Sequence, residues 1–390
     1  MMKNAGNDPL FTLTTGPVDA YPAVLRALSM PVWYDYDPAF LACFERVSRK
    51  AAAAMRTESI PLILQGEPVL ALEAAAASLI ARHDVVLNLV SGVYGAGFGD
   101  WAGRYCATVR ELAVAYNEAL DPAVVDRELR RHPEIGIVCL CHHDTPSGTL
   151  NPVDEIGCVV KRHGRLFLVD AVSSFGGMAV TPDSCRADIF ITGPNKCLGC
   201  PPSLSLVAVS EGGWRKIKAN PDAPRASVLS LLDWERAWLA DEPFPYTPSV
   251  AEINGLEAAL DGYLGEGPEQ VWARHDLTAR AFRAGLRAMG LSLWAARESI
   301  ASPTATAIRV PEGVDEAQWR ALAREHYGVM FSSGRGETLG KVMRVGHMGP
   351  TARPLYAVVA LTALGGALNR LRAGRVDVGT GVNAAMAVIG

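Results

Sequence analysis

Two residue types that cooperate in pyridoxal chemistry follow two apolar segments of this chain. Asp170 ends the segment 166–169, and Lys196 follows the segment 187–191 after the turn 193–195. Short apolar runs flanked by turn residues are typical of strands, so both side chains should emerge at the carboxyl edge of one sheet. A lysine amine can form a Schiff base with an aldehyde, and a carboxylate can keep a pyridine nitrogen protonated so that the ring accepts electrons. The pair therefore predicts a pyridoxal site.

Each of these residues taken alone has a simpler interpretation. An aspartate at a strand end is usually a turn or cap residue, and a lysine in a loop is usually a solvated charge. Asp170 and Lys196 are better explained together, because both follow apolar strands and their spacing suits one sheet edge.

Composition and charge argue against several classes of function. The 390 residues are 49% hydrophobic and 20% charged, which suits a large core divided between two domains. The net charge of −4 and the isoelectric point near 6.1 provide no field for a polyanion, so no nucleic-acid partner is expected. Residues 1–10 lack the apolar run of a secretory signal, and the run 355–368 is too short to cross a bilayer. We expect a cytoplasmic protein with no membrane partner.

The eight cysteines suggest one alternative chemistry, a zinc site. The segment 139–144 and the pair Cys197 and Cys200 could together supply four soft ligands. However, the segment 137–141 has the pattern of a buried strand, in which cysteine serves as a small hydrophobe and His142 faces away from the two cysteines. We therefore expect no metal, and in a reducing compartment the Cys-x-x-Cys pair need not be bonded.

Strand and helix patterns alternate along the first two thirds of the chain. The expected strands cover residues 60–64, 84–90, 107–114, 135–141, 166–169, 187–192 and 203–209. The expected helices cover residues 44–55, 67–81, a segment that begins at 94, 122–131 and 152–163. Such alternation favours an α/β fold with a mostly parallel sheet covered by helices on both faces.

A second unit follows a long helix that is expected between Pro248 and about residue 262. Its expected elements are helices over 271–289, 316–327 and 353–371 and strands near 291, 305, 329 and 341. We predict an N-terminal arm over 1–20, a large α/β domain over 21–262, a smaller α+β domain over 263–375 and a C-terminal tail over 376–390.

Four stretches of the chain resemble the class V, fold-type I aminotransferases, which include the alanine-glyoxylate and serine-glyoxylate enzymes. The resemblance covers roughly residues 20–372. It rests on the arginine-bearing C-terminal segment and on the motifs Val169-Asp-Ala-Val-Ser-Ser174, Gly193-Pro-Asn-Lys196 and Thr145-Pro-Ser-Gly-Thr149.

The resemblance implies a role for each matching residue. Lys196 would form the Schiff base, Asp170 would partner the ring nitrogen, Thr145 would lie near the ring hydroxyl and Tyr94 would stack on the ring. Tyr94 could instead pack under a loop, but a flat ring favours an aromatic neighbour. Thr247 would reach a phosphate in the neighbouring subunit's site, which implies at least a homodimer and allows a homotetramer.

Two arginines of the C-terminal domain could bind a carboxylate. Arg344 lies within an apolar strand pattern, and glycines flank Arg335, which would let a ligand approach closely. Arginines are usually solvated, yet a guanidinium grips a carboxylate with two hydrogen bonds. In the family, the arginine of the Met-Arg-Val-Gly segment, here Arg344, binds the carboxylate of the amino or keto acid, and Arg335 is a second cation.

Glu67 departs from the family pattern. Class V members generally place small or hydroxyl residues at this point and hold the cofactor's phosphate with backbone N–H groups at the start of a helix. A carboxylate here could simply favour the helix start. It would nevertheless face the 5′ substituent of the ring, repel a phosphate and accept a hydrogen bond from an alcohol.

This departure predicts a vitamin B6 form without phosphate as the substrate. The chain resembles the class V members that convert pyridoxamine and pyruvate to pyridoxal and L-alanine in vitamin B6 degradation, with pyridoxal bound covalently to Lys196 and no separate cofactor. One alternative is an alanine-glyoxylate or serine-glyoxylate aminotransferase that uses pyridoxal phosphate. The other is a binding protein for B6 vitamers without catalytic activity.

Overall fold

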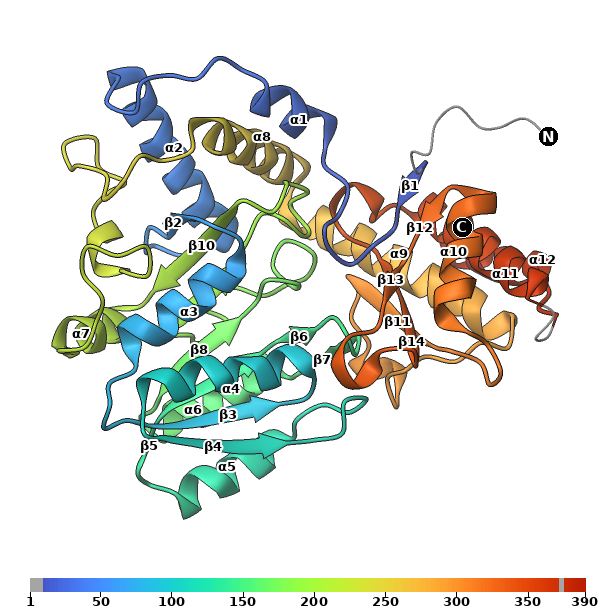
Figure 1. The fold of residues 1–390 in the computed structure, drawn as a ribbon, viewed down its shortest axis with the longest axis horizontal. Coiled ribbons are helices and arrows are strands. Elements are labelled where there is room, and N and C mark those ends of the chain that lie inside the picture. The colour runs from blue at the N-terminus through green and yellow to red at the C-terminus, as the bar shows by residue number, and fades with distance from the viewer. Residues whose placement is uncertain (1–9, 372–374) are drawn as a thin grey trace.

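The structure is a computed structural model that describes residues 10–371 and 375–390. Residues 1–9, which include most of the segment examined for a secretory signal, lie outside the described residues. Figure 1 shows two lobes, a larger one coloured blue to yellow and a smaller one coloured orange to red. No helix within the described ranges is both long and apolar enough to cross a membrane.

A seven-stranded sheet forms the centre of the larger lobe, in the strand order β2-β10-β9-β8-β5-β3-β4. Strand β10 runs in the direction opposite to the other six strands of this sheet, so the predicted mostly parallel sheet is confirmed. The strands are β2 (Leu62–Gln65), β3 (Val85–Val90), β4 (Thr108–Ala113), β5 (Ile135–Cys141), β8 (Leu166–Asp170), β9 (Ile189–Thr192) and β10 (Leu204–Val209). The central strands are buried along nearly their whole length, which explains their continuous apolar sequences.

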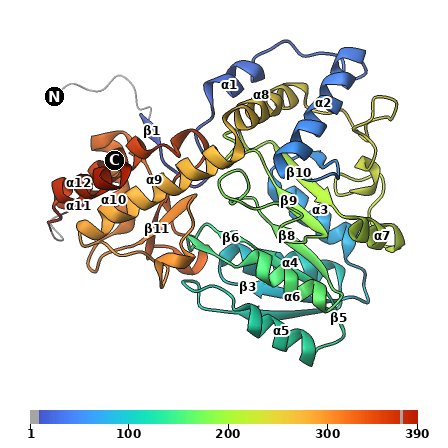
Figure 2. The ribbon, with the colours of Figure 1, turned by 180° about the vertical axis from the view of Figure 1, so that it is seen from behind.

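Helices cover both faces of this sheet. In Figure 1, α3 and α4 lie in front of the strands, whereas α6 lies in front in Figure 2, which is seen from behind. The helices of this lobe are α1 (Pro22–Leu28), α2 (Pro38–Met55), α3 (Pro68–Leu79), α4 (Val93–Tyr105), α5 (Pro122–Arg131), α6 (Val153–Arg162), α7 (Glu211–Ala219) and α8 (Val250–Glu266). Helix α2 begins six residues earlier than predicted, because Asp37 caps the Ala39 N–H at 2.8 Å and Pro38 suits the first turn.

The smaller lobe is built on a three-stranded antiparallel sheet in the order β11-β14-β13. Its strands are β11 (Ala305–Arg309), β13 (Ser332–Ser333) and β14 (Val342–Gly346), and its helices are α9 (Pro268–Ala288), α10 (Glu316–Tyr327), α11 (Pro354–Arg370) and α12 (Val378–Ile389). The strand predicted near residue 291 is reduced to a single bridge between Leu293 and Ile308.

Both ends of the chain contribute to the smaller lobe. Strand β1 (Phe11–Thr12) pairs in parallel with β12 (Val329–Met330), and the blue β1 lies beside orange elements in Figure 1. No element is predicted for residues 376–390, but they form α12, which packs on α9 and α11. Leu13 and Ala385 are fully buried in the same apolar core. Residues 11–13 of the N-terminal arm are therefore attached to the C-terminal lobe.

Candidate active site

The sheet brings Asp170 and Lys196 to one edge, as the strand pattern predicts. Asp170 is the last residue of β8 and lies opposite Cys141 of β5 and Ile191 of β9. Lys196 follows β9 after a short turn in which Gly193 packs so closely on Pro68 that a side chain at 193 would overlap the proline ring. This close approach explains the glycine in the Gly-Pro-Asn-Lys motif.

These two residues line a cavity of about 470 Å³ together with three other predicted residues, Glu67, Tyr94 and Arg335. The remaining wall is largely apolar and is formed by Pro68, Val69, Leu72, Val93, Gly97, Trp101, Val172 and Ser173. Five of the seven predicted site residues therefore meet at one cavity between α3, α4 and the strand ends.

Burial changes the protonation of the two central groups. It raises the pKa of Asp170 to about 6, although the Val172 N–H at 2.9 Å opposes the change. It lowers the pKa of Lys196 to about 8, and the charge of Arg344 acts in the same direction. An amine with this pKa is partly neutral near pH 8, which a nucleophile that attacks an aldehyde requires.

Glu67 sits at the start of α3, and its carboxylate makes two contacts. One oxygen accepts a hydrogen bond from the Val69 N–H at 3.0 Å, so Glu67 is the N-cap of the helix. The other accepts a long contact of 3.5 Å from the Asn195 side chain, next to Lys196. Glu67 therefore both caps the helix, as the simpler interpretation has it, and lines the cavity.

Arg344 and Thr145 are not among the residues that line the cavity. Arg344 is in the middle of β14, where it is 7% exposed, and its Nε donates to the Ser333 carbonyl at 2.6 Å. Burial lowers the pKa of the Arg344 guanidinium, and the nearby Tyr94 side chain opposes this change. Thr145 is 1% exposed, and its hydroxyl has no hydrogen-bond partner among the described residues.

Arg335 and Thr247 are both exposed. Arg335 precedes a short 3-10 turn in the small lobe and reaches the cavity rim. Thr247 lies before α8 and does not line this chain's own cavity.

Two buried residues of the site are absent from the sequence prediction, Asp144 and His143. Asp144 accepts hydrogen bonds from the backbone N–H groups of Tyr94 at 2.7 Å and Gly95 at 3.1 Å, so it fixes the start of α4. His143 Nδ1 lies 3.1 Å from the Ser173 carbonyl and 3.0 Å from the Thr304 hydroxyl of the small lobe. The available signal was their position immediately after the buried strand β5, in a run whose residue types also suggest metal ligands.

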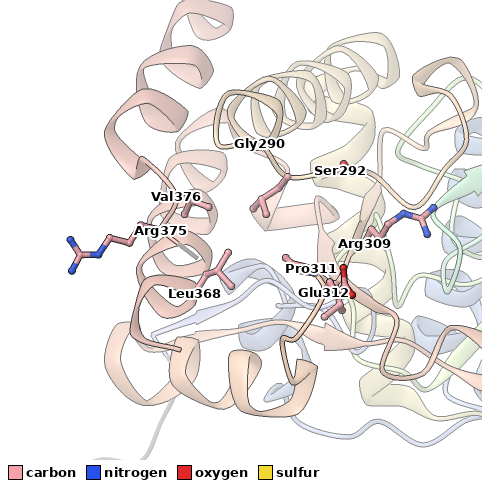
Figure 3. Close-up of a pocket in the computed structure, with 10 residues that line it drawn as sticks. Gly290, Ser292, Arg309, Pro311, Glu312, Leu368, Arg375 and Val376 are labelled. Atoms are coloured by element: carbon pink, nitrogen blue, oxygen red, sulfur yellow. The ribbon is translucent and has the colours of Figure 1, made fainter. Parts of the chain in front are cut away.

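The described residues contain neither a group arranged for zinc nor a predicted site residue in the cavity of the small lobe. No group of three or more His, Cys, Asp or Glu side chains within residues 10–371 and 375–390 is arranged to hold a metal ion. A cavity of about 300 Å³ in the small lobe is lined by Gly290, Ser292 and Pro311 among others. Figure 3 shows that its two arginines, Arg309 and Arg375, point away from it. None of the predicted site residues lines this second cavity.

The residues of the main cavity fit a hydroxypyridine ring that carries an aldehyde or amine. Asp170 is a buried carboxyl that a protonated ring nitrogen would neutralise, and the buried Thr145 hydroxyl has no hydrogen-bond partner among the described residues. Lys196 supplies the amine and Tyr94 an aromatic wall.

Comparison with known proteins identifies the same family that the sequence motifs resemble. Residues 98–353 match the model of the class V aminotransferases. A pyridoxamine-pyruvate transaminase of Mesorhizobium japonicum is 64% identical over 383 residues, which cover 98% of this chain and 97% of that protein. The crystal structure of pyridoxamine-pyruvate aminotransferase from Mesorhizobium loti has a TM-score of 0.97 at 64% identity, again covering 98% of this chain and 97% of that one.

A more distant solved structure has the same architecture. The ureidoglycine-glyoxylate aminotransferase of Bacillus subtilis is 29% identical and has a TM-score of 0.92, with 99% of this chain and 100% of that chain covered. The predicted fold type I architecture is thus confirmed, and the chain belongs to the class V aminotransferases.

Proposed function

We propose that this chain transfers the amino group of pyridoxamine to pyruvate, which yields pyridoxal and L-alanine, as a step of vitamin B6 degradation. The observation that carries the proposal is the position of Glu67, whose carboxylate caps α3 and lines the same cavity as Asp170 and Lys196. The pyridoxamine-pyruvate transaminase that is 64% identical supports the same reaction.

Glu67 disfavours a phosphate in two ways. Its charge would repel a phosphate at close range by roughly several kcal/mol at an effective dielectric constant near 20. Its side chain also already takes the Val69 N–H, one of the helix N-terminal donors that would otherwise bind the anion. A hydroxymethyl group is neutral and can donate a hydrogen bond to the carboxylate. The cavity therefore suits pyridoxal and pyridoxamine better than their phosphates, so the vitamer is a substrate and no separate cofactor is needed.

The large lobe holds and activates the ring. When bound, the protonated ring supplies an electron sink for the pair that is left after a proton departs from carbon. Asp170 keeps the ring nitrogen protonated, Tyr94 stacks on the ring face, and Thr145 contacts the ring hydroxyl. Lys196, as a free amine, would move a proton from C4′ to Cα; it would then form the covalent link to C4′ as L-alanine leaves, before water releases pyridoxal.

The small lobe holds the carboxylate of pyruvate or alanine. Arg344 is the main cation, because it is buried and fixed by the Ser333 carbonyl, so its guanidinium is presented in one orientation. Arg335 adds a second positive charge from the exposed rim.

We also propose that the chain forms at least a homodimer in the cytoplasm. Exposed apolar side chains gather in the segment between α1 and α2, namely Met30, Val32, Trp33, Tyr34 and Tyr36, and such a patch commonly marks an interface. All eight cysteines are free thiols, which suits a reducing compartment.

One assay tests this function. The purified protein, freed of vitamers, is mixed with pyridoxamine and pyruvate without pyridoxal phosphate, and pyridoxal and L-alanine are measured. We expect steady turnover, and little binding of pyridoxal phosphate in a separate absorbance titration. Tight phosphate binding with activity only after its addition would instead favour an alanine-glyoxylate or serine-glyoxylate aminotransferase. Vitamer binding without any turnover would favour the non-catalytic binding protein.

A further inference from the structure

The N-terminal arm reaches the amine of Lys196. The Thr15 carbonyl accepts a hydrogen bond from Lys196 Nζ at 2.6 Å, although the two residues are 181 positions apart. Thr15 is 2% exposed, so this contact is shielded from water. The next residue, Gly16, packs so closely on the lysine that a Cβ at this position would overlap Nζ.

The small lobe fixes the Thr15 carbonyl. The Thr15 N–H donates to the Ser332 hydroxyl at 3.0 Å, and the preceding Leu13 carbonyl accepts from the Gly346 N–H at 2.9 Å. Lys196, in contrast, is held by the strand ends of the large lobe. The contact between the carbonyl and the amine therefore crosses the boundary between the two lobes.

We propose that Thr15 is a positioning residue for Lys196, and that its carbonyl holds the amine whenever the amine is not covalently linked. In the proposed reaction, on which this inference rests, the free amine must stay close enough to carry a proton from C4′ to Cα and then to reach C4′ itself. A free lysine has a flexible four-carbon stem, so one strong acceptor restricts it to orientations near the reacting atoms.

The same carbonyl is linked to the group proposed to bind the keto acid. Ser332, which holds the Thr15 N–H, lies opposite Arg344 in the pairing of β13 with β14. The next residue of β13, Ser333, accepts the Arg344 Nε–H. Arg344 and the Thr15 carbonyl are therefore carried by one rigid unit, and the carboxylate site and the amine keep a fixed separation.

Several charged groups surround Lys196 and change its pKa. The Thr15 carbonyl opposes burial, which has the largest effect on that pKa. Burial and Arg344 lower the pKa of Lys196, whereas Glu67, Cys197 and Asp170 raise it. The neutral His143 is also close enough for its ionisation to be opposed by Lys196. A carbonyl that accepts from the ammonium favours the charged form. Displacing it should therefore lower the pKa of Lys196 further.

The test compares Gly16→Ala with Gly313→Ala. A methyl group at Gly16 would displace the arm from Lys196 Nζ, whereas Gly313 also has a positive φ of +75° but faces open space, so its variant reports backbone strain alone. In the protein without vitamer, the ionisation of Lys196 is followed by its rate of carbamylation with cyanate over a range of pH. We expect Gly16→Ala to shift this titration to lower pH by about half a unit to one unit. Gly313→Ala should leave it unchanged.

A second variant keeps the test valid if Gly16→Ala fails to fold. Ser332→Ala removes the hydroxyl that accepts the Thr15 N–H but does not touch Lys196, so it should shift the titration in the same direction by less. In transamination, both variants should lower kcat several-fold and change the KM for pyruvate less. An unchanged Lys196 titration in every folded variant would overturn the inference. Absence of turnover in the wild type would instead overturn the proposed function, because the cyanate titration needs no substrate.

Discussion

The two sides of the main cavity are built in different ways. On the side of the large lobe, Asp170 and Lys196 follow strands of one sheet and are deeply buried. On the side of the small lobe, Arg344 is buried within β14, but Arg335 stands exposed at the rim. The ring site is therefore fixed by the sheet, whereas the acid site combines one buried and one exposed cation. This contrast predicts the largest losses from changes to the buried reacting groups of the first side and graded losses from the two arginines of the second.

The largest effect should follow the loss of the amine. Lys196→Ala removes both the covalent link and the proton carrier, so turnover should fall by roughly a thousandfold or more. Pyridoxamine should still bind, because the contacts of Tyr94 and Asp170 persist. The measurements are the initial rate of alanine formation and calorimetric binding of pyridoxamine, with the exposed Lys341→Ala as the control. Alanine formation near the wild-type rate would remove Lys196 from the mechanism.

Low pH should destabilise the small lobe more than the large lobe. Burial lowers the pKa of His275 and of His347 to about 3, whereas histidine in an unfolded chain titrates near 6.5. Stability from these groups is complete above about pH 6.5 and is lost as the pH falls toward the folded values, because only the unfolded chain takes up the protons. Two such protons should destabilise the small lobe by about 3 kcal/mol per pH unit, roughly a hundredfold in its unfolding equilibrium.

The large lobe should resist acid better, because its buried groups oppose one another. Burial lowers the pKa of His142 to about 4 and that of His143 to about 3, but it raises those of Asp144 and Asp170 to about 6. Between about pH 6 and 4 the folded lobe binds two protons on the aspartates while the unfolded chain binds two on the histidines. Hydrogen exchange measured across this range should show α9 and β14 losing protection before β5 and β8. The reverse order would contradict the contrast.

The two arginines should differ in their effect on pyruvate. Arg344→Ala removes a buried, charge-assisted contact worth about 1.5 to 3 kcal/mol, so the KM for pyruvate should rise by roughly ten- to a hundredfold. Arg335→Ala should raise it only a few-fold, because exposed ion pairs contribute about 1 kcal/mol or less. The KM for pyridoxamine should change little in either variant. Equal losses for both substrates would point to a structural role for the arginine.

Glu67→Gln should shift vitamer preference by about tenfold, a smaller change than the loss of turnover expected for Lys196→Ala. The variant keeps a side-chain oxygen that can cap Val69 but removes the negative charge. Binding of pyridoxal phosphate should therefore improve, and pyridoxamine turnover should fall. Absorbance titrations with pyridoxal and with pyridoxal phosphate measure both effects. If only the melting temperature changed, Glu67 would be a cap residue and nothing more.

Much of the large lobe could be predicted from the sequence because strand ends carry local signals. Apolar runs that end in turn residues located Asp170 and Lys196 at one sheet edge, and the structure places both there. The direction of β10 could not be predicted in this way. Its six residues are all buried, and a continuous apolar pattern is the same whichever way the strand runs.

The contacts that were missed depend on backbone groups and distant pairings. The Thr15 carbonyl has no side-chain signature, and it meets Lys196 only because β1 pairs with β12 far along the chain. Residues 376–390 have an apolar composition rich in Gly and Ala, which are weak signals alone, and α12 is stabilised by packing on α9.

The Glu67 cap also bears on how easily the bound molecule departs. In a site where backbone N–H groups grip a phosphate, dissociation leaves those donors without a partner until water replaces the anion, which favours a long residence time. Here the Val69 N–H keeps its carboxylate partner whether the cavity is empty or filled. Departure of the ring therefore exposes no unsatisfied donor at this position. This arrangement suits a substrate that must leave in every catalytic cycle. A cofactor that stays bound would not need it.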